Sequence, residues 1–425
     1  MSEYQPRIAD KLLKQQIESI GAVLIEGPKA CGKTTTAEQQ AKSILYMDDP
    51  DHISQNLHLA ETHITTLLQG NTPRLIDEWQ LAPQLWDAIR FTVDHRNSDG
   101  QFLLTGSAVP ADVSKINHSG AGRFAWLTMR PMTLWESGES SGTVRLSDLF
   151  SHHTPIDGTS TLTFDQVAFA VCRGGWPKAI NKKSETAALN QVTNYYEAIT
   201  RDDISRVDGI ERNEQRAKRL LRSYARHQGS QASINTIVED IRVNEKESIS
   251  DETVSSYINA LKKIFVIEDM SAWNPNLRSK ASIRTADTHY FVDPSVAAAA
   301  LGIGPKDLIN DLETFGLLFE TLCVRDLRVY AQANDGNVYH YRDSNKLECD
   351  AVVHLRNGQY GLVEIKLGGD TLINSGVATL KLLASKLDTT KMKEPSFLMV
   401  LTAVGTYAYQ RTDGVYVIPI GCLRE

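Results

Sequence analysis

The sequence has few cysteines, no long apolar run and no excess of positive charge. Its five cysteines are scattered, and no two of them form a C-x-x-C pair. This spacing argues against a disulfide framework or a cysteine-rich zinc site, and it favours a reducing compartment. No apolar stretch approaches the ~20 residues of a membrane span, and residues 1–7 are polar without a signal-peptide core. We therefore expect a cytoplasmic location and no membrane partner.

The charge balance gives no global attraction to nucleic acid. The 425 residues include 45 lysines and arginines against 52 aspartates and glutamates, a formal net charge of −7. A contact with DNA would have to come from local basic faces. The length predicts two or three domains, and the fractions of apolar and charged residues are typical of a globular chain.

The most informative motif is a glycine-rich stretch near the amino end. Residues 27–34 read Gly-Pro-Lys-Ala-Cys-Gly-Lys-Thr and fit the pattern G-x-x-x-x-G-K-[ST] of the phosphate-binding P-loop. An apolar run at 22–25 precedes the motif and predicts a buried parallel strand, while residues 35–42 predict a helix after it. A strand, such a loop and a helix amino terminus can hold a polyphosphate, because backbone N–H groups and the helix dipole favour the anion.

The expected cofactors are ATP and Mg²⁺. Lys33 would reach the β- and γ-phosphates, and Thr34 would ligate Mg²⁺. The whole nucleotide-binding set that we predict is Gly27, Pro28, Lys29, Ala30, Cys31, Gly32, Lys33, Thr34, Thr35, Asp77, Thr105 and Ser107.

A second nucleotide element is expected one or more strands after the P-loop. Residues 74–78 form a short apolar run that ends in Asp77 and Glu78. Alone, two adjacent acids are common in a solvated turn. In a P-loop ATPase, however, Asp77 at this position would hold Mg²⁺ and Glu78 would polarise the attacking water. We therefore predict a catalytic role for Glu78 together with Lys33.

Two further features could complete an ATPase site. Residues 101–107 predict the next buried strand, where Thr105 or Ser107 could sense the γ-phosphate or cap the following helix. Arg123 follows in Gly-Ala-Gly-Arg-Phe. It could be a catalytic arginine finger that neutralises charge in the transition state, or a structural arginine at a domain seam. A finger that acts on a neighbour's nucleotide would require a homo-oligomer.

These segments resemble a bacterial and archaeal family of AAA+ ATPases whose members usually carry a C-terminal domain of unknown function. The matching segments are residues 4–8, 25–29, 31–35, 76–78, 104–107, 122–123, 130–136 and 174–177. The resemblance covers nearly the whole chain. It implies an ATP-driven protein of a kind often hypothesised to act on DNA, without settling the substrate.

The middle of the chain has the pattern of a winged helix-turn-helix, in which three helices precede a basic hairpin. The expected helices and β-like runs are residues 215–228, 234–241, 250–263, 265–270 and 289–293. Residues 215–228 are rich in arginine and lysine, and Arg278, Lys280 and Arg284 lie on the connection between the β-like runs. The last helix could enter a major groove while the wing contacts phosphate. The alternative is that this segment packs domains together.

The C-terminal part predicts a strand–hairpin–strand unit behind a helix. Residues 348–355 and 360–366 alternate as strands do, and 356–359 read as a hairpin turn. A helix is expected at residues 315–330.

Four chemically useful groups lie in these elements: Glu320, Asp350, Glu364 and Lys366. Glu364 and Lys366 point to one face of their strand, and Asp350 can lie on the same face. Two or three carboxylates can hold divalent cations that activate water, while Lys366 steers the nucleophile or neutralises charge. The pattern resembles the D…E-x-K core of the PD-(D/E)XK restriction-endonuclease-like fold. Asp350, Glu364 and Lys366 map onto that core, and Glu320 onto its helical acid. We predict Glu320, Asp350 and Glu364 as metal ligands, beside Thr34 and Asp77 in the ATPase.

The expected fold class is α/β with four parts. They are an AAA+ P-loop ATPase core at 1–140, a helical lid or linker at 141–210, a winged helix-turn-helix at 211–290 and a nuclease-like α/β domain at 291–425. The expected function is a Mg²⁺-dependent ATPase that binds branched or duplex DNA and processes branched or end structures, with a nuclease-like site that either cuts or has lost cutting. The alternative is a nucleotide-dependent switch or scaffold for signalling or defence, with an inactive nuclease-like domain.

Overall fold

The chain divides into two units, each built from segments that are distant in sequence. The computed structural model describes residues 4–106, 118–151, 156–244, 248–274, 286–390 and 392–425. Unit 1 comprises Met1–Pro131, Ala198–Asn213 and Tyr257–Val266. Unit 2 comprises Met132–Glu197, Glu214–Ser256 and Ile267–Glu425. The polypeptide therefore passes between the units several times.

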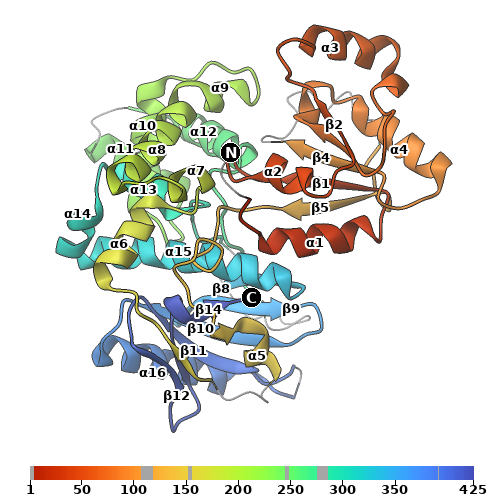
Figure 1. Ribbon diagram of the computed structural model, residues 1–425. Helices are drawn as coiled ribbons and strands as arrows, with labels where there is room; N and C mark the ends of the chain where they lie inside the picture. Colours follow the sequence, from red (N-terminus) through yellow and green to blue (C-terminus); the bar gives the residue numbers. More distant parts are fainter. Residues whose placement is uncertain (1–3, 107–117, 152–155, 245–247, 275–285, 391) are drawn as a thin grey trace. The chain divides into compact units, whose positions relative to one another are not determined.

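A parallel sheet of five strands forms the centre of unit 1 (Figure 1). Its strand order is β2-β3-β4-β1-β5, and the strands are β1 (Ala22–Glu26), β2 (Ser43–Tyr46), β3 (Arg74–Asp77), β4 (Phe102–Gly106) and β5 (Phe124–Thr128). The central strands β1 and β4 are almost wholly buried, which fits their continuous apolar runs. Because β1 lies between β4 and β5, the loop that follows β1 leaves the sheet between these two strands, at the carboxyl edge.

Helices complete unit 1 around this sheet. The helices before and within the sheet are α1 (Ile8–Ile17), α2 (Lys33–Glu38), α3 (Ile53–Thr62), η1 (Ile64–Thr66), η2 (Trp79–Leu81) and α4 (Leu85–Arg96). The later ones are a π-helical turn η4 (Ile199–Asp203) and α9 (Ile204–Arg206). In the core, the ring of Trp86 stacks on Phe124 with 3.8 Å between the ring centroids. The α4 helix is thereby fixed against the sheet.

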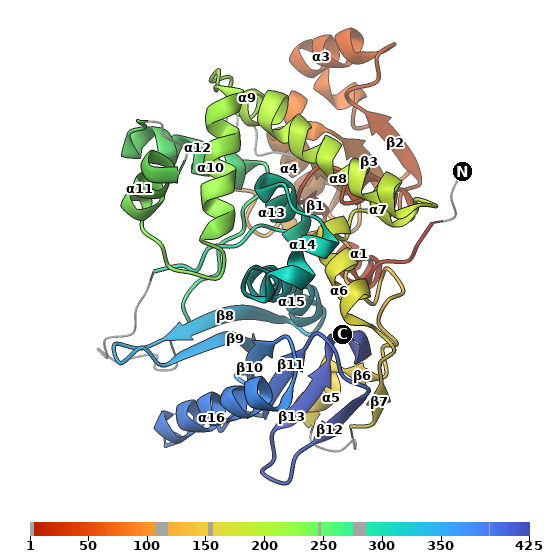
Figure 2. The same cartoon turned by 90° about the vertical axis from the view of Figure 1, so that its left-hand side faces the viewer.

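A mixed sheet of seven strands forms the base of unit 2. Its order is β7-β12-β13-β11-β10-β9-β8, and β10–β11 and β11–β13 are its parallel pairs. Figure 2 shows α15 on one side of this sheet and α16 on the other. The strands are β7 (Gly158–Thr159), β8 (Gly336–Arg342), β9 (Glu348–Leu355), β10 (Tyr360–Lys366), β11 (Phe397–Thr402), β12 (Tyr407–Gln410) and β13 (Tyr416–Pro419).

The helices of unit 2 fall into an early and a late group. The early ones are α5 (Leu146–Ser151), α6 (Phe164–Arg173), α7 (Pro177–Ile180), α8 (Glu185–Ala198), α10 (Glu214–Arg226), α11 (Ile234–Asn244) and α12 (Asp251–Lys263). Ala198 of α8 and the second half of α12, from Tyr257, are counted in unit 1. The late ones are α13 (Pro294–Leu301), α14 (Pro305–Asn310), α15 (Leu312–Ala333), α16 (Asp370–Lys386) and η5 (Ile420–Cys422). A small parallel pair joins β6 (Val144–Arg145) to β14 (Leu423–Arg424). Within the described ranges, no helix is long and apolar enough to cross a membrane.

Most elements expected from the sequence are present. The strands expected at 348–355 and 360–366 are β9 and β10 with the same bounds, and the helix expected at 315–330 lies within α15. The helix expected at 35–42 begins earlier, at Lys33, and ends at Glu38. Its start at Lys33 follows from Gly32, whose left-handed backbone occupies the N-cap position.

The two β-like runs at 265–270 and 289–293 do not form strands, so that expectation was wrong. Among the residues that the structure describes here, their pairing consists of the isolated antiparallel bridges Ile267–Phe291 and Met270–Thr288. Beyond Met270 the described chain pairs with β8 instead, where the N–H of Trp273 donates to the carbonyl of His340 at 2.6 Å. The basic residues expected on the wing, Arg278, Lys280 and Arg284, lie outside the described residues.

A buried arginine and two buried aspartates lie inside unit 2. Arg325 in α15 is 2% exposed, and Asp293 and Asp326 have no exposed surface. The guanidinium of Arg325 contacts Asp293 at 2.8 Å and Asp326 at 2.7 Å. The two carboxylates also accept backbone N–H groups of Gly175, Ser295 and Leu134. Each carboxylate of this Asp293–Arg325–Asp326 triad is therefore held by the guanidinium and by backbone N–H groups.

We predict that Arg325→Met strongly destabilises unit 2, because it leaves two carboxylates buried without a positive partner. The free energy of unfolding should fall by about 3–5 kcal/mol, measured by urea unfolding followed by circular dichroism. Arg356→Met is the control, since Arg356 and its partner Asp335 are 83% and 66% exposed, and it should leave the transition almost unchanged. Equal transitions for the two variants would show that the triad contributes little.

Candidate functional site

The register of the unit 1 sheet brings three chain segments to one edge. Glu26 at the end of β1 is paired with Gly106 of β4, and Asp77 of β3 is paired with Thr105. All these strands are parallel, so their carboxyl ends lie along the same edge. The P-loop, which follows Glu26 directly, therefore lies beside Asp77 and Thr105.

The backbone of the P-loop requires glycine at its first position. Gly27 has φ +147°, and a Cβ there would lie 2.0 Å from the carbonyl oxygen of Met129. Ala30 and Gly32 also have positive φ, of 64° and 105°. The thiol of Cys31 donates to the same Met129 carbonyl at 3.5 Å. The loop is thus seated directly on the segment that follows β5.

The side chains of this motif separate into buried and exposed groups. Lys33 is 6% exposed, and its Nζ donates to the carbonyl oxygens of Gly27 at 2.9 Å and Pro28 at 2.8 Å. Lys29 is exposed, and its Nζ contacts Oδ1 of Asp203 in η4 at 3.2 Å. Thr35 is exposed in the first turn of α2. Of these candidates, Lys33 is the one held inside the loop.

Two hydroxyl groups meet one carboxylate at the end of β3. Oγ1 of Thr34 donates to Oδ1 of Asp77 at 2.9 Å, and Oγ1 of Thr105 donates to the same oxygen. Burial raises the pKa of Asp77, while the two hydroxyl donors oppose that rise. A hydroxyl and a carboxylate side by side supply oxygen ligands of the kind that Mg²⁺ takes when phosphates and water complete its shell. Thr34 and Asp77 therefore fit the predicted Mg²⁺ site.

Glu78 stands next to this group in an unusual backbone conformation. Its φ and ψ are 53° and 42°, in the left-handed region that few residues adopt. Nε2 of Gln80 donates to the Glu78 carboxylate, and burial raises the pKa of Glu78. Gln80 belongs to no motif in the sequence, so its contact with the Glu78 carboxylate could not be predicted from it.

Two other candidates are not brought to this edge. Arg123 precedes β5, whose first residue Phe124 is paired with Ala22 at the amino end of β1. Arg123 lies at the opposite edge of the sheet from the P-loop, where its Nε contacts Oδ1 of Asp94 at 2.7 Å. Ser107 lies outside the described residues.

The C-terminal candidates Asp350, Glu364 and Lys366 meet in unit 2. Nζ of Lys366 lies 2.7 Å from Oε2 of Glu364 and 3.1 Å from Oδ2 of Asp350. The N–H of Ile365 also donates to Asp350, at 2.7 Å. Glu364 is 4% exposed. The alternation of the two strands thus places the three side chains together, as expected.

Glu320 approaches this cluster from α15. The hydroxyl of Tyr290 donates to its Oε1. Burial and the nearby Asp350 carboxylate raise the pKa of Glu320, and the same two causes raise the pKa of Glu364. Burial acts to lower the pKa of Lys366, but the two carboxylates around it outweigh burial and raise it. We call Glu320, Asp350, Glu364 and Lys366 the acid cluster.

The acid cluster does not fit a metal centre in this arrangement. Lys366 already occupies the position between Asp350 and Glu364 where a cation would bind. Across the described ranges, no group of three or more histidine, cysteine, aspartate or glutamate side chains is placed to hold a metal ion. A metal site at the three carboxylates stays a prediction.

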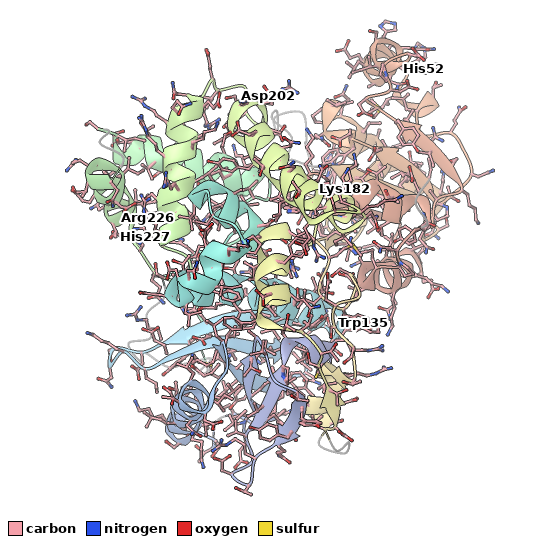
Figure 3. The ribbon with its side chains drawn as sticks, turned by 60° about the vertical axis from the view of Figure 1, so that its left-hand side comes forward. His52, Trp135, Lys182, Asp202, Arg226 and His227 are labelled. Carbon is pink, nitrogen blue, oxygen red and sulfur yellow. The ribbon has the colours of Figure 1, made fainter. Side chains whose placement is uncertain are left out.

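The expected basic helix is α10, and part of its charge is neutralised by acids. Nζ of Lys218 lies 2.8 Å from both Glu197 and Glu214. Arg226, shown beside His227 at the end of α10 in Figure 3, lies 2.6 Å from Asp240 in α11. These pairs leave a weaker basic face than the sequence suggests.

Comparison with family models assigns the amino-terminal segment. Residues 19–137 match the model described as an AAA domain. This part of the chain is an AAA-type ATPase domain. Residues 165–307 and 315–423 match two models described as domains of unknown function, DUF8612 and DUF4143. The middle and C-terminal segments thus have counterparts in other proteins without an assigned activity.

The chain is also similar to individual proteins. Two curated relatives, the uncharacterized proteins Mb2031c of Mycobacterium bovis and Rv2008c of Mycobacterium tuberculosis, are 23% identical over 362 residues, or 85% of this chain and 73% of theirs. The Walker-type ATPase PABY2304 of Pyrococcus abyssi has 13% identity and a TM-score of 0.41, over 68% of this chain and 94% of its own. The Aeropyrum pernix ORC1 protein in complex with DNA has 14% identity and a TM-score of 0.24, over 73% of this chain and 95% of its own.

We predict that Gly27→Ala abolishes binding of ATP, because the added methyl group would collide with the Met129 carbonyl and displace the P-loop. Gly209→Ala is the control, since Gly209 also has a positive φ, of 71°, and no atom of the described residues lies within 4 Å of its Cβ position. Binding is measured with a fluorescent ATP analogue. Retention of wild-type affinity by Gly27→Ala would contradict this description of the loop.

Proposed function

We propose that this chain is a Mg²⁺-dependent ATPase that binds and processes DNA, with branched or end structures as its substrates. The observation that carries the ATPase part is the convergence of Lys33, Thr34, Asp77 and Thr105 beside the P-loop. The AAA domain match of residues 19–137 supports it independently.

The residues of this site have separable tasks in hydrolysis. When bound, Mg²⁺ would neutralise charge on the phosphate oxygens. Thr34 and Asp77 can hold it, and Lys33 can exchange its two carbonyl acceptors for phosphate oxygens. Glu78 can accept a proton from the attacking water, and the rise in its pKa on burial makes its carboxylate a better base.

The proposal includes a homo-oligomeric form of the enzyme, with Arg123 as the candidate arginine finger. Arg123 lies at the amino edge of the sheet, so it is remote from the P-loop of its own chain. Its side chain, paired with exposed Asp94, is 43% exposed. A finger role for Arg123 would therefore require the nucleotide of a neighbouring copy.

The DNA-processing part of the proposal rests on unit 2. The acid cluster brings together two carboxylates and a lysine from one sheet and the Glu320 carboxylate from α15, groups of the kind that phosphodiester cleavage uses. The helices α10, α11 and α12 follow one another as in a winged helix-turn-helix. Cleavage would require Lys366 to move away from Asp350 and Glu364 so that a cation can take its place.

A nucleotide-dependent switch or scaffold for signalling or defence is the second candidate. The position of Lys366 between Asp350 and Glu364 favours it, because a lysine in place of a metal ion would leave the nuclease-like domain inactive. In that case ATP would change the arrangement of the domains, and DNA would not affect its turnover.

We predict different defects for two variants of the ATPase site. Lys33→Ala should lose ATP binding, because it removes the buried ammonium that would contact the phosphates. Glu78→Gln should bind ATP but hydrolyse it roughly a hundredfold or more slowly, because a general base is lost. The measurements are binding of a fluorescent ATP analogue and steady-state release of phosphate. Normal hydrolysis by both variants would refute the ATPase assignment.

The DNA-processing part predicts that one DNA form stimulates ATP hydrolysis and is cut. The assay combines phosphate release with gel analysis of single-stranded, duplex and four-way-junction DNA. Glu364→Gln should abolish cutting and keep the stimulation. Glu348→Gln is the control, because this glutamate begins the same sheet's β9, is 52% exposed and pairs with Arg342.

Two outcomes would count against this reading. Cutting that persists in Glu364→Gln would exclude the acid cluster as the nuclease site. Turnover that no DNA form changes would favour the nucleotide-dependent switch.

A further inference from the structure

Arg7 precedes every strand of the unit 1 sheet, and its side chain contacts the P-loop. It is 7% exposed, and its Nη1 donates to the carbonyl oxygen of Cys31 at 2.8 Å. Its Nη2 donates to the carbonyl oxygen of Arg130, also at 2.8 Å. One buried guanidinium therefore joins the P-loop to the segment that follows β5.

From these contacts we infer that Arg7 is a positioning residue for the nucleotide phosphates, an inference that rests on the proposed ATPase function. It orients the P-loop without touching the nucleotide. Nothing in the P-loop motif itself points to Arg7, because the residue lies outside that motif.

The geometry of the peptide unit explains how a hydrogen bond to a carbonyl of the P-loop can affect an N–H group that binds phosphate. The carbonyl of Cys31 and the N–H of Gly32 belong to one planar trans peptide, so they point in opposite directions. Arg7 holds the carbonyl, and the Gly32 N–H must then point away from Arg7. Backbone N–H groups of a P-loop are the donors that bind phosphate oxygens. Arg7 thereby sets the direction of one of these donors.

The second contact fixes the support on which the loop rests. Arg130 follows Met129, whose carbonyl accepts the thiol of Cys31 and lies against Gly27. By binding the Arg130 carbonyl as well, the guanidinium of Arg7 links the P-loop to the segment after β5 against which the loop packs. Loss of the guanidinium would release the loop and its support at the same time.

The backbone around Arg7 is itself anchored. The N–H of Arg7 donates to Oδ2 of Asp10 at 2.7 Å. Tyr4 donates its hydroxyl to Oδ1 of Asp10 at 2.6 Å and lies 3.1 Å from Oγ1 of Thr36 in α2. Arg7 is therefore presented to the loop from a fixed segment, which is the condition under which a side chain can position another group.

The test compares Arg7→Met with Arg74→Met in the full-length protein. Arg74 is a suitable control because its guanidinium also binds a carbonyl, that of Leu67 at 2.9 Å, and the hydroxyl of Ser43. It begins β3, at the edge of the sheet opposite the P-loop. Affinity for a fluorescent ATP analogue with Mg²⁺ is measured at a temperature where circular dichroism shows every variant folded.

We expect Arg7→Met to weaken nucleotide binding roughly tenfold or more, since it removes two hydrogen bonds from a charged donor. Arg7→Lys should fall between Arg7→Met and the wild type, because one ammonium can still reach one carbonyl. Arg74→Met should lower the unfolding temperature and keep wild-type affinity.

The outcomes separate this inference from the function on which it rests. Unchanged affinity in Arg7→Met, with only a loss of stability like that of Arg74→Met, overturns the positioning role and leaves the ATPase proposal intact. A wild-type protein that binds no ATP analogue overturns both.

Discussion

Unit 2 depends on the compensation of buried charge in the Asp293–Arg325–Asp326 triad. Removing three charged groups from water is costly, so the cost must be met by partners at close range. Asp326 accepts the N–H of Leu134, and Asp293 accepts that of Gly175. Segments that lie far apart in the sequence must therefore be in place before the triad is satisfied. The triad favours one arrangement of these segments, because any other leaves a buried charge without a partner.

The same triad gives a physical reason for two sequence patterns that resemblance alone had singled out. In Gly174-Gly175-Trp176-Pro177, a Cβ at the first glycine would lie 2.3 Å from the Asp293 carboxylate, and one at the second would lie 2.1 Å from the Met132 carbonyl. Both positions require glycine, because the backbone there lies so close to these two groups that a side chain would not fit. In residues 130–136, the N–H of Leu134 is the group that the triad requires.

The sequence predicted local patterns well and side-chain partners poorly. The alternation in β9 and β10 was enough to bring Asp350, Glu364 and Lys366 together, because a strand has a fixed period. Nothing in that period shows that Lys366 would settle between the two acids. Likewise, the P-loop pattern identified Lys33, but the link from Arg7 joins positions 24 residues apart. Such contacts depend on how the chain folds back, which a local motif does not contain.

The separation of Arg123 from the P-loop has a consequence for symmetry. The two lie at opposite edges of one parallel sheet, because every strand of that sheet runs in the same direction. An assembly that used both in one reaction would have to place the amino edge of one copy against the carboxyl edge of the next. Two kinds of symmetry meet this condition: a twofold dimer in which each copy offers its Arg123 to the P-loop of the other, and a head-to-tail contact that closes into a ring or continues as a filament.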